Sequence, residues 1–152
     1  GAAGATGAAG LPGPNITASA GYAANTQGSL ITVLVAGTAI PLPNNQVLSG
    51  DITVNGANTI FTVANFGRYR ISYYINTTAS LLLGSRLMIN GSANTASTIT
   101  PVLSLSNYKN EIEIDLTAGS TVSLQMFAPI ILGAATLLSN ACGASLTIIR
   151  LQ

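Results

Sequence analysis

From about residue 20 to the last residue, the sequence is a series of short runs rich in β-branched and aromatic residues. Turn residues such as Asn55-Gly56, Asn90-Gly91 and Ala118-Gly119-Ser120 separate the runs, because Asn and Gly accept a positive φ at low cost. No long stretch has the apolar period of a helix. The pattern predicts an all-β sandwich or jelly roll of about ten strands. The predicted strands are roughly residues 22–26, 29–35, 51–54, 59–64, 69–77, 86–89, 102–105, 111–116, 121–127 and 144–151.

Several runs alternate between apolar and polar side chains. From residue 69 to 75 the odd positions are apolar or aromatic, whereas Arg68 and Arg70 lie on the opposite face. Residues 111–116 and 121–127 alternate in the same way, with acidic or small polar side chains at every second position. An antiparallel strand of this kind is covered on one face only. We therefore expect the apolar face of these strands to form the core of the sandwich.

Three runs are apolar at nearly every position: residues 30–35, 81–83 and 129–132. If they are strands, both of their faces must be covered, and a two-sheet sandwich covers one. We therefore expect a second copy of the chain to cover the other face. With the inward positions above, this gives the candidate core or trimer-interface residues Leu30, Val33, Val35, Tyr69, Ile71, Tyr73, Leu82, Ile114, Leu124, Met126, Ile130, Leu132 and Ile148.

Glycine occupies positions 1, 4, 7, 10 and 13 of the N-terminal segment. A collagen triple helix needs glycine at every third position, because no side chain fits at its crowded axis. The alternative is a flexible Ala/Gly linker, but the strict register disfavours it. We interpret residues 1–14 as the end of a longer collagen-like stalk and residues 15–152 as a globular head. Since a collagen stalk holds three chains, the head is expected to be a homotrimer.

The composition excludes most chemistry. The 152 residues include five Lys and Arg, four Asp and Glu, one Cys and no His. Acid–base catalysis and metal sites depend mostly on residue types that are scarce here, so we expect no enzyme, cofactor or metal site. A net charge of +1 gives no basic field for nucleic acid, and no apolar run is long enough for membrane insertion. The lone Cys142 is expected to be a small buried residue.

Most of the charged side chains fall in two short rows. Glu111, Glu113 and Asp115 share one strand face, and Arg68 and Arg70 share another. A calcium site or a catalytic carboxylate pair needs converging groups, which one strand does not supply, so we favour a solvated face with cross-strand ion pairs. Asp51 and the other acids are candidate partners of Arg86, and the sequence alone does not derive a pairing.

Two local motifs resemble those of the C1q and tumour-necrosis-factor superfamily. Residues 61–71, from Phe61 to Gly67-Arg68-Tyr69-Arg70-Ile71, resemble its strand signature, with Ile71 in place of the usual aromatic residue. Residues 116–124 resemble its Leu-x-x-Gly-Asp-x-Val-x-Leu turn and strand, with Ser120 in place of Asp. Residues 144–151 are similar to its closing strand. With its low charge and its Ala/Thr collagen triplets, the chain resembles BclA-type collagen-like glycoproteins of bacterial spores, and its globular part resembles their C-terminal domain. The resemblance also suggests a clostridial source.

This resemblance implies a homotrimeric jelly roll at the tip of a filament on the outermost spore layer, the exosporium. It also implies glycosylation of the stalk on threonine, which in this chain points to Thr6. The expected function is a structural trimerisation head that holds three chains in register, with self as the main partner. The alternative is a C1q-like recognition or adhesion module that binds a host protein or glycan. The sequence does not identify a ligand.

Overall fold

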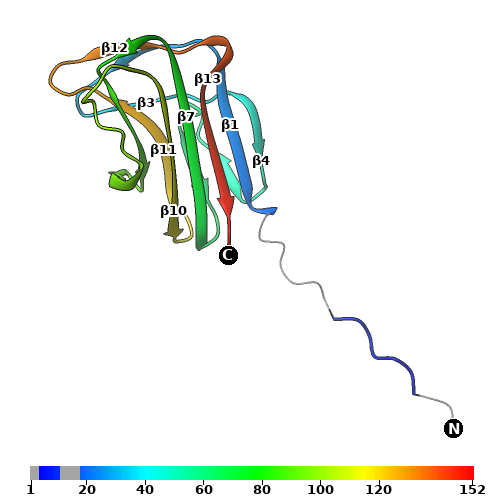
Figure 1. Ribbon diagram of the computed structural model, residues 1–152. Coiled ribbons are helices and arrows are strands. Elements are labelled where there is room, and N and C mark those ends of the chain that lie inside the picture. The colour runs from blue at the N-terminus through cyan, green and yellow to red at the C-terminus, as the bar shows by residue number, and fades with distance from the viewer. Residues whose placement is uncertain (1–3, 11–17) are drawn as a thin grey trace.

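The structure, a computed structural model, describes residues 4–10 and 18–152. Two antiparallel sheets face each other in a sandwich (Figure 1). The five-stranded sheet has the order β10-β7-β13-β1-β4. Its strands are β1 (Ala20–Gln27), β4 (Asn44–Leu48), β7 (Gly67–Leu81), β10 (Leu105–Leu116) and β13 (Ser139–Arg150).

The second sheet has the order β5-β6-β11-β8-β9, and β3 pairs with β11. These strands are β3 (Thr38–Ala39), β5 (Ile52–Val54), β6 (Ile60–Val63), β8 (Gly84–Ile89), β9 (Ser92–Ala93) and β11 (Thr121–Phe127). A short 3-10 helix, η2 (Thr95–Ser97), follows β9. A separate ribbon of β2 (Leu30–Val33) and β12 (Gly133–Thr136) lies across one end of the sandwich (Figure 1).

The core lies between the two sheets and follows the predicted alternation. Tyr69, Ile71 and Tyr73 of β7 are fully buried, while their neighbours Arg68 and Arg70 are exposed. The facing sheet contributes Phe61, Val63, Leu87, Val122, Leu124 and Met126. The all-β jelly-roll prediction is therefore confirmed, and the strand phase of β7, β10 and β11 is as expected.

The structure corrects several predicted strands. The predicted strand at 102–105 is a loop except for Leu105, the first residue of β10. The apolar run at 129–132, which would need cover on both faces if it were a strand, is a loop. The predicted strand at 29–35 is shorter and alternates, with Ile31 and Val33 buried and Leu30 exposed. In the third apolar run, residues 81–83, only Leu81 belongs to a strand, as the last residue of β7. None of the three runs is therefore a strand that needs apolar cover on both faces.

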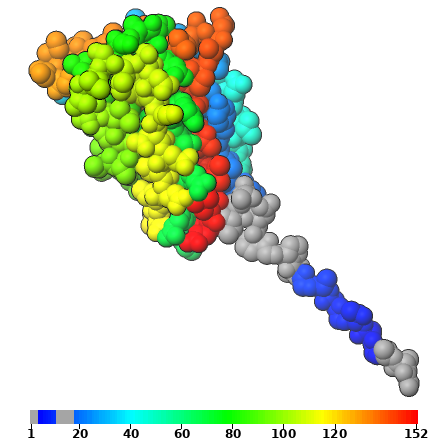
Figure 2. Space-filling model, viewed as in Figure 1, coloured from blue at the N-terminus to red at the C-terminus, as the bar shows by residue number. Residues whose placement is uncertain are grey.

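The two ends of the sandwich differ, and we name them by position. The stalk pole is the end at which β1 begins and β13 ends, and residues 4–10 extend away beyond it (Figures 1 and 2). The apical pole is the opposite end, which carries the β2–β12 ribbon and the loop after β11 (Figure 1). The predicted boundary between residues 14 and 15 lies outside the described residues.

Candidate association surfaces

The outward face of the five-stranded sheet has an ionic half on β7 and β10. Cross-strand pairing places Arg68 opposite Asp115 and Arg70 opposite Glu113. Arg68 Nε lies 2.9 Å from Asp115 Oδ1, and Arg70 Nη2 lies 2.8 Å from Glu113 Oε1. Arg70 also approaches Glu111, with 3.7 Å between its Nε and Oε1. The prediction that the two charged rows form cross-strand ion pairs is therefore confirmed.

These ion pairs are exposed, so water and salt weaken them. The hydrogen bond from Arg68 nevertheless lowers the pKa of Asp115, and the same contact raises the pKa of Arg68. Among the described residues no three His, Cys, Asp or Glu side chains converge on a metal position. The side chains of Glu111, Glu113 and Asp115 therefore form ion pairs with Arg68 and Arg70.

The other half of this face, on β1, β4 and β13, carries no charge on its outward side chains. Tyr22 lies between Val47 of β4 and Thr147 of β13 in the cross-strand register. Ile149 follows toward the stalk pole and is partly buried, while Val47 is 71% exposed. Across β13, Tyr74 of β7 is exposed as well. An outward sheet face ordinarily carries charged and polar side chains, so this uncharged half with its exposed Tyr22 and Val47 is a candidate contact surface.

A second group of exposed apolar side chains lies at the apical pole. It comprises nine of the fourteen large exposed hydrophobic residues found in the described part of the chain. We call this group the apical cluster; its members are Leu30, Leu34, Val35, Leu82, Val102, Leu103, Ile130, Ile131 and Leu132. Leu30 begins β2, and the other eight lie on four loops that follow β2, β7, η2 and β11.

Backbone contacts bring these four loops together. Ala128 N–H donates to Leu34 O at 3.1 Å, which joins the loops after β2 and β11. The pairs Leu81–Leu105 and Ser85–Ile99 flank the loops after β7 and η2 and hold them side by side. Residues distant in sequence thus form one apolar surface.

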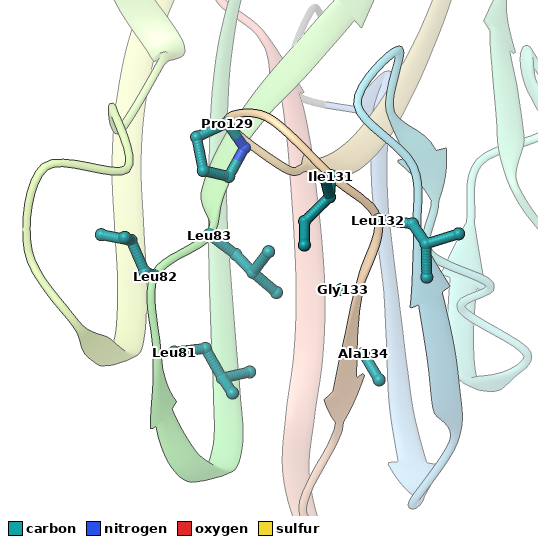
Figure 3. A pocket seen from close by; sticks show the side chains of 8 residues that line it. All are labelled: Leu81, Leu82, Leu83, Pro129, Ile131, Leu132, Gly133 and Ala134. Carbon is teal, nitrogen blue, oxygen red and sulfur yellow. The ribbon is translucent and has the colours of Figure 1, made fainter.

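The loops after β7 and β11 enclose a shallow depression of about 290 Å³. Figure 3 shows Leu83 pointing into the space between them, while Leu82 and Leu132 point away on either side. Leu83 is buried, whereas Ile131 and Leu132 are 77% and 62% exposed. The loop tips therefore project rather than form a deep groove.

The sequence-based candidates separate into two groups. One group is buried in the protomer core: Val33, Tyr69, Ile71, Tyr73, Leu124, Met126 and Ile148, with Ile114 partly buried against it. The other group is exposed at the apical pole: Leu30, Val35, Leu82, Ile130 and Leu132. Subunit contact by the second group stays a prediction. Tyr22 and Val47 were not among the predicted contact residues. The sequence of β4 (NNQVL) lacks a strand pattern, and the run at 22–26 does not show which face Tyr22 occupies.

A carboxylate network fixes the stalk pole where the chain enters β1. The hydroxyls of Ser19 and Ser49 both donate to the carboxylate of Asp51, and Asn65 Nδ2 donates to it at 2.9 Å. The hydrogen bonds from Ser19 and Ser49 lower the pKa of Asp51. Asp51 thus ties the first residues of the head to two turns of the other sheet.

Two further hypotheses are wrong. Arg86 does not pair with Asp51 or another acid: its Nε donates to Gln125 Oε1 at 2.6 Å, and its guanidinium lies 4.2 Å from the centroid of the Phe127 ring. Cys142, expected to be buried, is exposed near the start of β13.

Thr6, the expected glycosylation site, is exposed. Among the described residues no helix has the length and apolarity needed to cross a membrane.

The family model described as the BclA C-terminal domain matches residues 21–152. The chain belongs to this family. The match covers the whole sandwich except the first residue of β1. The expected resemblance to BclA C-terminal domains is therefore confirmed. The two superfamily-like motifs have clear positions in this BclA domain: Gly67 begins β7, and residues 116–124 form the turn from β10 into β11.

Solved structures show the same fold at low sequence identity. The murine APRIL crystal structure matches with a TM-score of 0.59 and 13% identity, covering 87% of this chain and 98% of that one. Eiger TNF from S. frugiperda gives 0.54 and 14%, covering 88% and 91%. Rabbit GITRL gives 0.53 and 14%, covering 76% and 93%. The BclA domain is thus a TNF-like jelly roll. No curated protein matches the chain.

Proposed function

We propose that this BclA domain is a structural head that joins three identical chains and holds their collagen-like stalks in register on the exosporium, the outer surface of a spore. The observation that supports this most directly is the uncharged half of the outward sheet face, with Tyr22 and Val47 exposed on a lone protomer. An obligate subunit interface buries on the order of 2,000–5,000 Å² and resembles a divided core. The family and the glycine register of residues 1–13 support the same function.

The position of this face suits the connection to a stalk. The five-stranded sheet runs from the apical pole to the stalk pole, where its strand β1 begins (Figure 1). Contact along this face brings three β1 strands near one axis, so the preceding segments leave the head close together. Only closely spaced chains can wind with glycine at a common axis. Contact at the apical pole alone would leave the stalk ends apart.

We further propose that the head has no catalytic function and that Thr6 carries a glycan. The acidic side chains Glu113 and Asp115, the best candidates for chemistry, are bound by arginines. Thr6 is exposed and occupies the third position of its triplet, where a side chain points away from the collagen axis. Mass spectrometry of the native protein tests the glycan, and an unmodified Thr6 peptide would exclude it.

The association is tested by light scattering on the purified chain. We expect about three times the chain mass of 15.3 kDa. Tyr22→Asp should give a monomer, because it places three unpaired charges in the contact. The matched control is Ile60→Asp on the outward face of the other sheet, where the parent side chain is also exposed. A parent chain that is monomeric at micromolar concentration, or a trimeric Tyr22→Asp variant, would refute the proposal.

A further inference from the structure

A pocket at the stalk pole combines an exposed aromatic ring with charged and polar side chains. Its lining includes Phe66, Arg68, Asp115, Thr117 and Gln152, which come from the start of β7, the end of β10 and the residues after β13. We call it the Phe66 pocket. Its volume is about 390 Å³, larger than the apical depression and within the ~300–1,000 Å³ range of small-molecule sites.

The backbone that carries Phe66 is fixed by the residues at the end of β13. Phe66 O accepts a hydrogen bond from Arg150 Nη2 at 3.1 Å, and Arg68 N–H donates to Gln152 O at 2.9 Å. Between them Gly67 has no room for a side chain, since a Cβ atom there would clash with Gln152 O. The Phe66 side chain is nevertheless 73% exposed. An exposed ring on a fixed backbone is pre-organised, so less entropy is lost when a ligand binds it.

The charged side chains of the pocket balance each other. Arg68 holds the carboxylate of Asp115 through two nitrogens, with Nε at 2.9 Å from Oδ1 and Nη2 at 3.4 Å from Oδ2. Both side chains stay accessible to a ligand, at 47% and 71% exposure. The exposed Thr117 hydroxyl and Gln152 amide add groups that both donate and accept hydrogen bonds. The pocket therefore offers hydrogen bonds without a net charge.

We propose that the Phe66 pocket binds a neutral saccharide unit. A pyranose ring has a face of C–H groups, which packs on an aromatic ring, and a rim of hydroxyls that both donate and accept hydrogen bonds. An anion would meet the carboxylate of Asp115, and a cation would meet the guanidinium of Arg68. A purely apolar ligand would remove water from both charges without replacing its hydrogen bonds. A neutral saccharide satisfies the ring and the paired charges together.

This chemistry has two sources. One is a glycan carried by a collagen-like stalk, since the pocket lies at the pole beyond which residues 4–10 extend (Figure 1). The other is a free saccharide in the surroundings of the head. Because the pocket is formed within one protomer, binding does not require the proposed trimer, and only the stalk-borne source rests on the proposed glycosylation.

The test measures the binding of methyl glycosides to the purified full chain by saturation-transfer NMR and titration. The panel contains the common neutral hexoses, deoxyhexoses and N-acetylhexosamines, with glucuronic acid as the anionic probe. We expect a neutral glycoside to bind with a Kd on the order of 1–10 mM. Phe66→Ala should weaken this binding about tenfold or more, whereas Phe66→Trp, which keeps an aromatic ring, should retain it. The matched control is Ile60→Ala, an exposed apolar side chain on the other sheet, whose loss should leave binding unchanged.

Several results would overturn the assignment. If no neutral glycoside binds the parent, or if glucuronic acid binds more tightly than all of them, the neutral-saccharide assignment is wrong. A Phe66→Ala variant that binds like the parent places the saccharide outside the pocket. If the same variant has a lower mass than the parent in light scattering, Phe66 belongs to a subunit contact, which also overturns the inference.

The glycosylated native protein distinguishes the two sources. Binding of the free glycoside only after enzymatic removal of the native glycan supports the inference and assigns the pocket to the chain's own glycan. Equal binding before and after removal supports it and assigns the pocket to a free saccharide. Absence of binding in both samples, with the parent recombinant chain also silent, overturns it.

Discussion

The hydroxyl of Tyr73, on β7, donates a 2.6 Å hydrogen bond to the carbonyl oxygen of Ser97, in η2. The same hydroxyl lies 2.9 Å from Ser85 Oγ on β8, so one buried oxygen connects three segments. Burial raises the pKa of Tyr73 to about 12, so the hydroxyl stays a donor well into the alkaline range. This contact joins the five-stranded sheet to the opposite side of the sandwich.

Removing this hydroxyl should destabilise the head. Tyr73→Phe leaves the buried Ser97 carbonyl without this donor, and an unpaired buried polar group costs about 1–3 kcal/mol. The measurement is urea unfolding at neutral pH. Tyr74→Phe, on the exposed face of the same strand, is the control and should change the unfolding free energy by less than about 0.5 kcal/mol. Equal effects of the two substitutions would contradict the assigned role.

A carboxylate introduced at an inward-facing position should destabilise the head more when that position is more deeply buried. Tyr69 is fully buried, so Tyr69→Asp should cost several kcal/mol, on the order of the ~5–15 kcal/mol stability of a domain, and prevent folding. Ile114 is partly buried, and Ile114→Asp should cost about 1–3 kcal/mol. Thermal melting checks both, with the exposed Thr53→Asp as control. A parent-like melting temperature for either core variant would show that the strand phase is wrong.

The Asp51 network predicts a stability change in acid. Because the pKa of Asp51 is lowered in the folded state, its contribution is present above the unfolded pKa and disappears as pH falls through the folded value. Asp51→Asn should therefore be less stable than the parent at about pH 7, and the difference should narrow below about pH 4. Urea unfolding across this range gives the comparison. If the difference in unfolding free energy between the parent and Asp51→Asn stays constant with pH, the ionised carboxylate is not the cause of that difference.

Gly37, in the loop between β2 and β3, should tolerate no side chain. Its φ is +106°, and a Cβ atom would lie 2.1 Å from Gln125 Cδ, the side chain that binds Arg86. We expect Gly37→Ala to cost about 2–3 kcal/mol. Gly119 has a similar φ of +82° with open space around it, so Gly119→Ala should cost only about 1 kcal/mol. If Gly37→Ala and Gly119→Ala lower the unfolding free energy equally, the contact with Gln125 does not add to the cost at Gly37.

Period-two patterns made the core predictable, while short strands escaped detection. The alternation around Tyr69 and Leu124 placed both side chains in the core, because a strand with one covered face must alternate. In contrast, β3 and β9 have two residues each, and β4 begins with Asn44-Asn45, which the sequence suggests is a turn. Their pairing depends on partners far away in sequence, which local composition does not specify.

The surface was harder to predict than the core. A loop of Pro129-Ile130-Ile131-Leu132 has the composition of a buried strand, and only the three-dimensional arrangement shows that its side chains project at one end. Tyr22 faces outward because Ala23 faces inward, and neither residue type determines that choice. The pairing of the acidic row with the arginine row was predictable on the condition that their strands are neighbours, whereas the register that places Arg68 opposite Asp115 comes from the structure.

Strand β1 begins where β13 ends, since Ala20 pairs with Ile149, and this placement bears on how the head can be engineered. A peptide fused after Gln152 would emerge at the stalk pole, next to the start of β1 (Figure 1). A peptide inserted between Thr100 and Ser104, in the loop that precedes β10, would be displayed at the far tip. Display of a peptide at the apical pole of this head should therefore use that loop rather than a fusion after Gln152.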